Sequence, residues 1–222
     1  MELDQSIAIS VEGLSVDYRI SQKSGMLSIM KYNSVKALRN ISFEISRGEV
    51  VGIIGKNGAG KTTLLRAISG NLRPSQGRII TRGRVYTLSG ANPGLIQDMS
   101  GRENVRLMSE VYGIPEEEKG RFEKSVEEFC DLGEAYDRDI RTLSTGMAGR
   151  IGFGFTTSLR PEILLMDETL GVGDKSFRKK AEEKSIQFME RGETILLSTH
   201  SLNLAKELCT RGIFLVDGRL EM

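Results

Sequence analysis

Hydrophobic residues recur at every second position in some segments and at helical spacing in others. The alternating segments predict strands. Near the N-terminus apolar residues alternate with polar ones over 7–20 and 35–46, which predicts two β-strands. The segment between them, 21–34, is rich in Ser, Lys and Gly around Met26–Met30. This composition favours a hairpin connection with a short helix, and the alternative is an element that docks on a partner or a membrane surface.

Short apolar runs alternate with helical patterns in the rest of the chain. Val50–Ile54 is typical of a buried strand, and Lys61–Ser69 of a helix that Gly70 closes. Ser100 and Glu103 form a capping box that opens a helical region reaching about residue 160. The remaining strands are predicted at 78–88, 163–166, 194–197 and 213–216, and the remaining helices at 175–191 and 201–210.

This order of elements predicts an α/β fold with a mostly parallel sheet and right-handed crossovers. An antiparallel β subdomain precedes the sheet and an α-helical subdomain is inserted in it. We expect one domain over 1–222, with 1–99 and 161–222 forming the core and its β subdomain, and 100–160 the helical subdomain.

Composition narrows the class of protein. The 222 residues carry a net charge of +1, without the basic surplus of a nucleic-acid-binding protein. No apolar run approaches the roughly 20 residues of a bilayer span, and the acidic start is unlike a signal peptide, so we expect a cytosolic chain. Cys130 and Cys209 are expected to be core thiols.

A glycine loop lies between the predicted strand at 50–54 and the helix at 61–69. Its sequence fits the phosphate-binding pattern G-x-x-x-x-G-K-[ST]. Glycines let several N–H groups face one anion, Lys61 reaches the β- and γ-phosphates, and the Thr62 hydroxyl binds Mg²⁺. The predicted nucleotide-binding residues here are Gly55, Lys56, Asn57, Gly58, Ala59, Gly60, Lys61, Thr62 and Thr63.

Two carboxylates follow the apolar strand Ile163–Met166. Asp167 is expected to hold Mg²⁺ through water, and Glu168 to orient and polarise the attacking water as a general base. His200, the single histidine, follows another predicted strand and is expected beside the γ-phosphate. Ser144 and Gly146, in Leu143-Ser144-Thr145-Gly146-Met147, precede a helix and offer a second anion site, although the pentapeptide alone is typical of a helix cap.

Taken in order and spacing, these motifs resemble the ABC (ATP-binding cassette) ATPase family over nearly the whole chain. The resemblance implies ATP and Mg²⁺ as ligands, and a head-to-tail dimer in which each ATP lies between one phosphate-binding loop and the partner's 143–147 loop. It also implies that Asp174 lies in the loop that crosses between the two sites, and that Tyr18 stacks on adenine. From the residues alone, Tyr18 is a strand residue on a sheet face.

The chain departs from the family pattern at two places. The family's usual LSGGQ is LSTGM here, which keeps Ser144 and Gly146. The Gln that the family carries after the strand near 85–88, a Mg²⁺ ligand and link to the membrane subunit, is replaced; Ser89 is nearest by alignment, and Gln97 lies further along. With Ser100–Asn104 and 167–174, these departures resemble the ATPases that export teichoic acid, O-antigen and capsular polysaccharide.

The resemblance implies a motor subunit at the cytoplasmic face of the cell membrane. It would pair with a second copy and a separate integral-membrane permease, and reach a lipid-linked polymer through that permease. We expect the short form, without a further C-terminal domain. The alternatives are another transported substrate, a soluble ABC ATPase acting on ribosomes or DNA, and a P-loop metabolic kinase. A kinase would not explain why the chain has both the 143–147 loop and His200.

Overall fold

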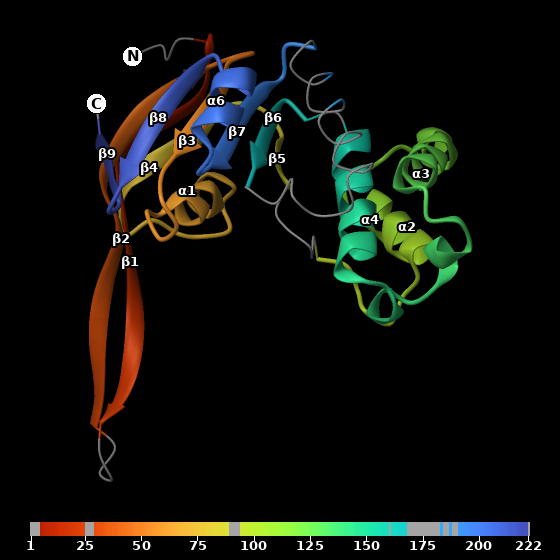
Figure 1. Cartoon of the computed structure of the whole chain (residues 1–222), viewed down its shortest axis with the longest axis horizontal. Coiled ribbons are helices and arrows are strands. Elements are labelled where there is room, and N and C mark those ends of the chain that lie inside the picture. The colour runs from red at the N-terminus through yellow and green to blue at the C-terminus, as the bar shows by residue number, and fades with distance from the viewer. Residues whose placement is uncertain are drawn as a thin grey trace. The chain divides into compact units, whose positions relative to one another are not determined.

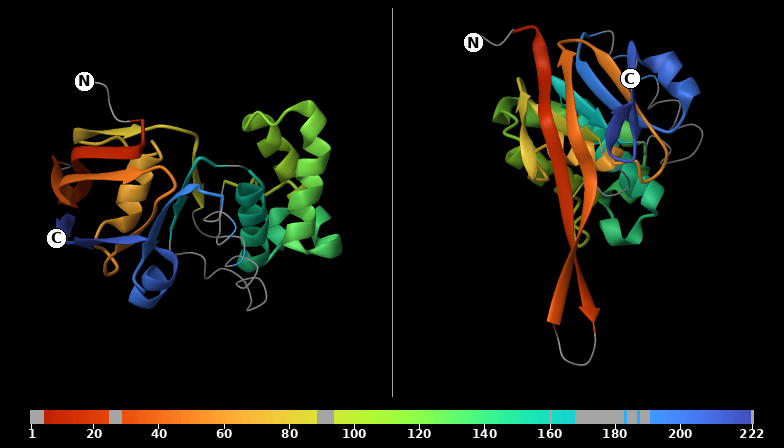
Figure 2. Two further views of the ribbon diagram at one scale, coloured as in Figure 1. Left: turned by 90° about the horizontal axis from the view of Figure 1, so that it is seen from above. Right: turned by 90° about the vertical axis from the view of Figure 1, so that its left-hand side faces the viewer.

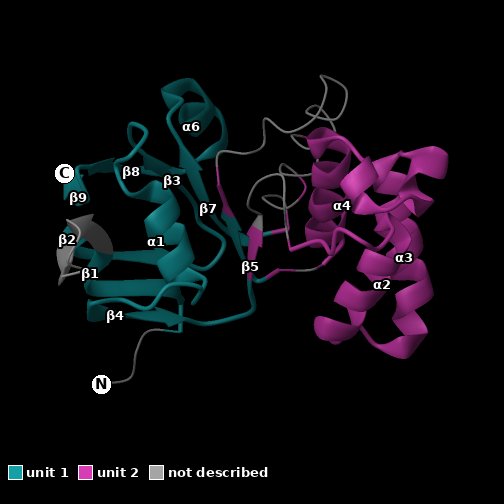
Figure 3. Cartoon of the chain, turned by 90° about the horizontal axis from the view of Figure 1, so that it is seen from below, with its two compact units in different colours: residues 1–85, 162–165, 192–222 teal, residues 86–161, 166–191 magenta. Residues whose placement is uncertain are grey.

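The computed structural model describes residues 5–24, 29–88, 94–159, 161–167, 183, 187 and 191–221, with the side chains of these residues other than 20–24, 29–33 and 88. The chain divides into two compact units (Figure 3). Unit 1 comprises residues 1–85, 162–165 and 192–222, and unit 2 comprises 86–161 and 166–191. Each is described by itself below.

An antiparallel sheet of three strands forms one layer of unit 1, in the order β2-β1-β4. The strands are β1 (Ile7–Ser24), β2 (Ile29–Ser46) and β4 (Gln76–Thr81). Strand β4 pairs with β1 only from Ile9 to Ser15. Beyond that point β1 and β2 continue as a two-stranded ribbon (Figure 1).

The ribbon corrects one sequence-based expectation. The described residues of the 21–34 segment are strand rather than short helix, and they pair in register from Ser21↔Tyr32 to Ser24↔Ile29. The β-branched and aromatic residues Ile29, Tyr32 and Val35 favour an extended chain, and two strands side by side satisfy each other's backbone groups. The expected hairpin connection is confirmed, with longer strands than predicted.

The second sheet has six strands in the order β5-β6-β7-β3-β8-β9. Its strands are β5 (Val85–Leu88), β6 (Ile163–Met166), β7 (Thr194–Thr199), β3 (Val50–Ile54), β8 (Arg211–Val216) and β9 (Arg219–Glu221). Strand β3 runs parallel to β7 and β8. The predicted Asp217-Gly218 turn reverses the chain into β9. The expected α/β fold class is confirmed.

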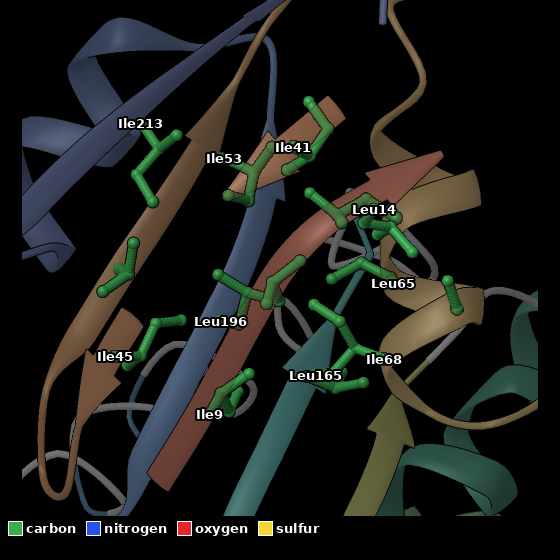
Figure 4. Packing of buried hydrophobic residues seen from close by; sticks show 14 of the residues in the cluster. Ile9, Leu14, Ile41, Ile45, Ile53, Leu65, Ile68, Leu165, Leu196 and Ile213 are labelled. Atoms are coloured by element: carbon green, nitrogen blue, oxygen red, sulfur yellow. The ribbon is translucent and has the colours of Figure 1, made fainter. Parts of the chain in front are cut away.

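Helix α1 (Lys61–Ile68) lies between the antiparallel sheet and the parallel strands of unit 1 (Figure 2). Its buried face includes Leu65 and Ile68, which pack with Leu14 and Ile41 from the antiparallel sheet (Figure 4). Every residue of β3 is buried, as expected of a parallel strand covered on both faces. This packing fixes the end of β3 and the start of α1, and therefore the loop between them.

Unit 2 is mostly helical. It contains α2 (Gly101–Val111), α3 (Glu116–Cys130), α4 (Thr145–Ser158) and the 3₁₀ turns η1 (Gly133–Asp137) and η2 (Ile140–Thr142). The predicted capping box at Ser100 and Glu103 is confirmed at the start of α2. A further helix, α6 (Leu202–Leu208), belongs to unit 1. Among the described residues, no helix has the length and hydropathy needed to span a membrane.

The side chain of Arg102 joins three elements of unit 2. Its guanidinium donates to both carboxylate oxygens of Glu127 in α3 and to Asp137 in η1, and it stacks on the ring of Tyr136 at 5.2 Å. These hydrogen bonds lower the pKa of both carboxyls and raise that of the guanidinium. The helix predicted at 175–191 lies almost wholly outside the described residues; Glu183 and Gln187 are helical.

Candidate nucleotide-binding site

The loop 55–60 leaves the end of β3 and is held to its neighbours by backbone hydrogen bonds. The N–H of Gly55 donates to the carbonyl of Thr199 at the end of β7, at 3.3 Å. Within the loop, the N–H of Ala59 donates to the carbonyl of Lys56 at 3.1 Å. The loop is thus tied to two adjacent parallel strands at the edge where both end.

Two glycines of the loop are required by sterics. A Cβ on Gly55 would lie 2.4 Å from the carbonyl oxygen of Leu215, which is backbone and has little freedom to move. Gly60 has φ of 107°, and a Cβ there would also lie 2.9 Å from the carbonyl oxygen of Ala37. The glycine pattern seen in the sequence therefore reflects close backbone packing as well as loop conformation.

Lys61 begins α1 and is 7% exposed. Its ammonium donates to the carbonyl oxygens of Gly55 at 2.7 Å and Lys56 at 3.3 Å, so it lies across the loop. The helix cap, Gly60, has no side chain to accept from the first-turn N–H groups, and the first turn has no acidic residue. A fixed cation beside a helix start that no side chain caps suits a phosphate group.

Tyr18 of β1 lies beside this helix start. Its phenol oxygen is 3.4 Å from the hydroxyl oxygen of Thr63, in the first turn of α1. The two residues are 45 positions apart in sequence, and the packing of the antiparallel sheet on α1 brings them together. The half-buried Tyr18 ring therefore lies close to where the base of a nucleotide would be if its phosphates occupied the loop.

A cavity of about 840 Å³ adjoins the loop. Gly55–Ala59 line it together with His200, whose exposed side chain follows β7. Leu202, Phe214 and Val216 give the cavity an apolar wall. The structure thus brings His200 and the phosphate-binding loop to one cavity, as the strand order predicts.

The predicted metal-binding and acidic residues are only partly described. Thr62 is exposed on the first turn of α1, and Asp167 follows β6 directly with its side chain half-buried. Hydroxyl and carboxylate oxygens are the donors that Mg²⁺ prefers, so both residues suit that ion. Ser89, Glu168 and Asp174 lie outside the described residues.

Ser144 and Gly146 lie at the start of α4 in unit 2. The Ser144 hydroxyl accepts from the N–H of Met147 at 3.3 Å, which makes it the N-cap of the helix. Both residues remain accessible, with Ser144 exposed and Gly146 half-exposed. The helix-cap interpretation is therefore correct, and it leaves the loop accessible to a further group.

The turn between β8 and β9 supports the loop, and the sequence patterns do not predict this contact. The N–H of Gly218, in the β8–β9 turn, donates to the carbonyl of Ala59 at 3.0 Å. The carbonyl of Gly218 in turn accepts from the N–H of Arg39 in β2 at 2.7 Å. The Asp217-Gly218 pair predicts a turn, but no local pattern predicts which distant backbone groups that turn will meet.

A buried strand, a glycine loop and a helix that begins with a buried lysine define a P-loop nucleotide-binding protein. A family model described as ABC transporter matches residues 38–171. Relatives that match most of the chain, given below, agree with that model. The chain belongs to the ABC transporter family.

The curated relatives are ATP-binding proteins of export systems. The teichoic acids export protein TagH of Lactococcus lactis is 42% identical over 83% of this chain and 40% of its own length. TagH of Listeria monocytogenes is 35% identical over 98% of the chain and 67% of its own length. The O-antigen export protein RfbE of Yersinia enterocolitica is 41% identical over 80% of the chain and 74% of its own length. The chain thus spans less than half of the Lactococcus relative.

Solved structures confirm the fold. An ATP-binding subunit of an ABC transporter superimposes with a TM-score of 0.78 at 24% identity, over 97% of this chain and 88% of its own. The ATP-binding cassette MJ0796, in a dimeric post-hydrolysis state with ADP and Pi, gives a TM-score of 0.78 at 23% identity, over 96% of this chain and 97% of its own.

Proposed function

We propose that this chain is the ATP-hydrolysing subunit of an exporter that moves a lipid-linked cell-surface polymer, such as teichoic acid or a polysaccharide. The observation that carries the ATPase assignment is the position of Lys61. Its buried ammonium lies across a glycine loop at the end of β3. Tyr18 lies beside Thr63 in the helix that Lys61 begins, and the loop and His200 line one cavity. The polymer assignment rests on the export relatives.

In this proposal the residues of the chain have separate roles in binding and hydrolysing ATP. Lys61 and the loop N–H groups bind the phosphates, Tyr18 orients the base, and His200 contacts the γ-phosphate. Glu168 accepts the proton of the attacking water. Thr62 and Asp167, and Ser89 as the position that aligns with the family's Gln, would hold Mg²⁺, which would neutralise charge on the phosphates.

Export needs partners. Two copies pair head to tail, so that Ser144 and Gly146 of one copy face the nucleotide of the other, and Asp174 lies in the loop between the two sites. A separate membrane permease carries the polymer, which places the chain at the cytoplasmic face of the membrane. Similarity of fold to the dimeric MJ0796 cassette and to cbiO1, part of the ABC transporter complex cbiONQ, supports this arrangement.

The chemical part of the proposal is tested with Glu168→Gln. Turnover should fall by roughly 10²- to 10⁴-fold, the usual contribution of a general base, while ATP still binds. Glu128→Gln, a change on the exposed side of α3, should leave turnover unchanged. Normal turnover in Glu168→Gln would remove that residue from the role.

The transport part is tested by purifying the tagged chain from detergent-solubilised membranes and identifying its partners by mass spectrometry. One integral-membrane permease at equal stoichiometry would support the exporter. Ribosomes or soluble partners alone would contradict it and leave the ATPase chemistry standing.

The end of the β1–β2 ribbon is a second point of contact in this proposal. The segment proposed to meet the permease or the lipid head of the substrate is Met26–Met30, of which 26–28 lie outside the described residues. No strand pairs with the described ribbon beyond Ser15 except its own partner. Deleting 23–33 would leave Arg19 opposite Ser34 with a three-residue turn between them. Transport should be lost while ATP hydrolysis persists, and unimpaired transport would exclude the role.

A further inference from the structure

The side-chain amide of Asn104 is buried in unit 2, and all of its hydrogen-bonding groups are used. The residue is 1% exposed. Its Oδ1 accepts from the N–H of Ile96 at 2.7 Å. Its Nδ2 donates to the carbonyl oxygens of Ile96, Met99 and Ser100, at 3.0, 3.2 and 2.8 Å. One side chain in α2 therefore fixes the backbone path of the preceding segment, 96–100.

That segment runs beside the residues that lead into the 143–147 loop. Two backbone hydrogen bonds join them: the N–H of Ile140 donates to the carbonyl of Met99 at 3.0 Å, and the N–H of Arg141 to that of Gln97 at 3.1 Å. Paired backbone groups that are partly shielded from water resist separation. A shift of 96–100 therefore moves 139–141 with it.

The side chain of Arg141 adds a link on the surface. Its two terminal nitrogens donate to Asp98 and to Asp139, each at 2.9 Å. The Arg141 side chain is 61% exposed, and exposed ion pairs add little to folding stability. This link can therefore be altered with a small effect on the fold.

The distance along the chain from this paired segment to Ser144 is short. The N–H of Leu143 donates back to the carbonyl of Ile140 at 3.0 Å, and the next residue, Ser144, caps α4. The direction in which Ser144 and Gly146 face is thus set by 139–141, which 96–100 holds in turn.

We propose that Asn104 is a positioning residue for ATP hydrolysis, because it holds the Ser144–Met147 loop in the orientation that meets the nucleotide of the second copy. This inference rests on the proposed head-to-tail dimer. An amide suits the position because it both accepts and donates, whereas an ionised carboxylate at the same place would face three carbonyl oxygens with no proton to offer. Misplacement of about 1 Å can cost 10²-fold in rate.

The test compares Asn104→Asp with Asn71→Asp, which makes the same change on an exposed side chain of unit 1. In Asn104→Asp, kcat should fall about tenfold or more. The Kd for ATP of the isolated chain should stay within about twofold, because the phosphate-binding loop belongs to unit 1. The ratio of variant to wild-type kcat should rise at lower pH, where the introduced carboxyl gains a proton to donate.

Unchanged kcat in folded Asn104→Asp would overturn the inference. So would, in the folded variant, a loss of ATP affinity equal to the loss of kcat, because the effect would then lie in nucleotide binding rather than in the Ser144–Met147 loop. Only a variant that is folded by circular dichroism is scored in this way. If Asn104→Asp is unfolded, the pair Arg141→Asp and Asp98→Arg provides the test: Arg141→Asp should lower kcat, and the double variant should restore at least half of it. If the losses of kcat in the two single variants simply add in the double variant, the link between Arg141 and Asp98 does not position the loop.

Gly146→Ala separates this inference from the proposed function. If Gly146→Ala lowers kcat and Asn104→Asp does not, the positioning role is wrong and the dimer stands. If neither variant lowers kcat, both are wrong. Loss of kcat in both, with ATP affinity retained in Asn104→Asp, supports both.

Discussion

The ammonium nitrogen of Lys61 lies 2.7 Å from the carbonyl oxygen of Gly55, six residues earlier in the same loop. The hydrogen bond joins the first residue of helix α1 to the first residue of the glycine pattern. The lysine is thereby held at the centre of the loop, with its stem buried against unit 1 and its charge directed at the backbone that would surround a phosphate.

We predict that Lys61→Met weakens ATP binding by about tenfold or more, because a hydrogen bond to a charged group contributes roughly 1.5–3 kcal/mol. Lys206→Met is the matched control: it removes an exposed lysine of α6, in the same unit but outside the loop, and should change affinity only slightly. Equilibrium titration with a fluorescent ATP analogue measures both. Equal losses in the two variants would mean that general charge, rather than the position of Lys61, binds the nucleotide.

Replacing Tyr18 separates its ring from its hydroxyl. Tyr18→Ala should lose about 1–3 kcal/mol of ATP affinity, the usual contribution of a base stacked on an aromatic ring. Tyr18→Phe keeps the ring and removes only the hydroxyl that lies near Thr63, so its affinity should be close to wild type. Competition with an adenine-free triphosphate gives the control, because its affinity should be the same for all three proteins.

Two glycines of unit 2 should respond in opposite directions to the same change. A Cβ on Gly101 would lie 2.7 Å from the carbonyl oxygen of Tyr136 and 2.8 Å from a methyl of Ile151, so Gly101→Ala should destabilise by about 1–3 kcal/mol. Gly120, inside α3, has open space, and Gly120→Ala should stabilise by about 1 kcal/mol. Urea denaturation followed by circular dichroism measures both, and destabilisation in Gly120→Ala would contradict the packing described for α3.

The Arg102 cluster should make unit 2 sensitive to acid. Hydrogen bonds from Arg102 lower the pKa of Glu127 and Asp137 from their ordinary values of 4.5 and 3.8. A carboxyl with a lowered pKa stabilises the folded state above its unfolded pKa, and that stability is lost as pH falls through the folded value. Protection of α2 amides from hydrogen exchange should therefore decline below about pH 4.5 in the wild type.

Arg102→Met should remove most of that decline, and should reduce protection at neutral pH by on the order of 1 kcal/mol, since the cluster is partly exposed. Lys124→Met, which removes an exposed lysine on α3, is the control and should retain the wild-type pH dependence. The same acid decline in Arg102→Met as in the wild type would exclude the cluster as its source.

The elements predicted best are those determined by residues that are close together in the sequence. The strand Val50–Ile54, the loop after it and the helix from Lys61 form one contiguous pattern, and the capping box at Ser100 spans four residues; the structure confirms these elements. Their local geometry follows from side-chain spacing and glycine alone.

Contacts between distant segments could not be predicted in this way. The position of Tyr18 beside Thr63 depends on how a sheet packs on a helix, and from residues alone Tyr18 is only a strand residue. Asn104 appears in sequence as one polar residue of an amphipathic helix, and its role becomes visible only with the backbone that surrounds it. The short helix expected within 21–34 is absent from its described residues, 21–24 and 29–34, because each strand there satisfies the backbone of the other; residues 25–28 lie outside the description.

The β1–β2 ribbon begins beside the nucleotide-binding site. Tyr18 pairs with Val35 there, and six residues further on Ser24 pairs with Ile29, which at a strand rise of about 3.3 Å per residue is a length of roughly 20 Å. One continuous ladder of hydrogen bonds thus joins the ring beside α1 to the far end of the hairpin. The ribbon is anchored at the sheet at one end. A tilt of a few degrees near Tyr18 would therefore displace the far end by more than it displaces the ring.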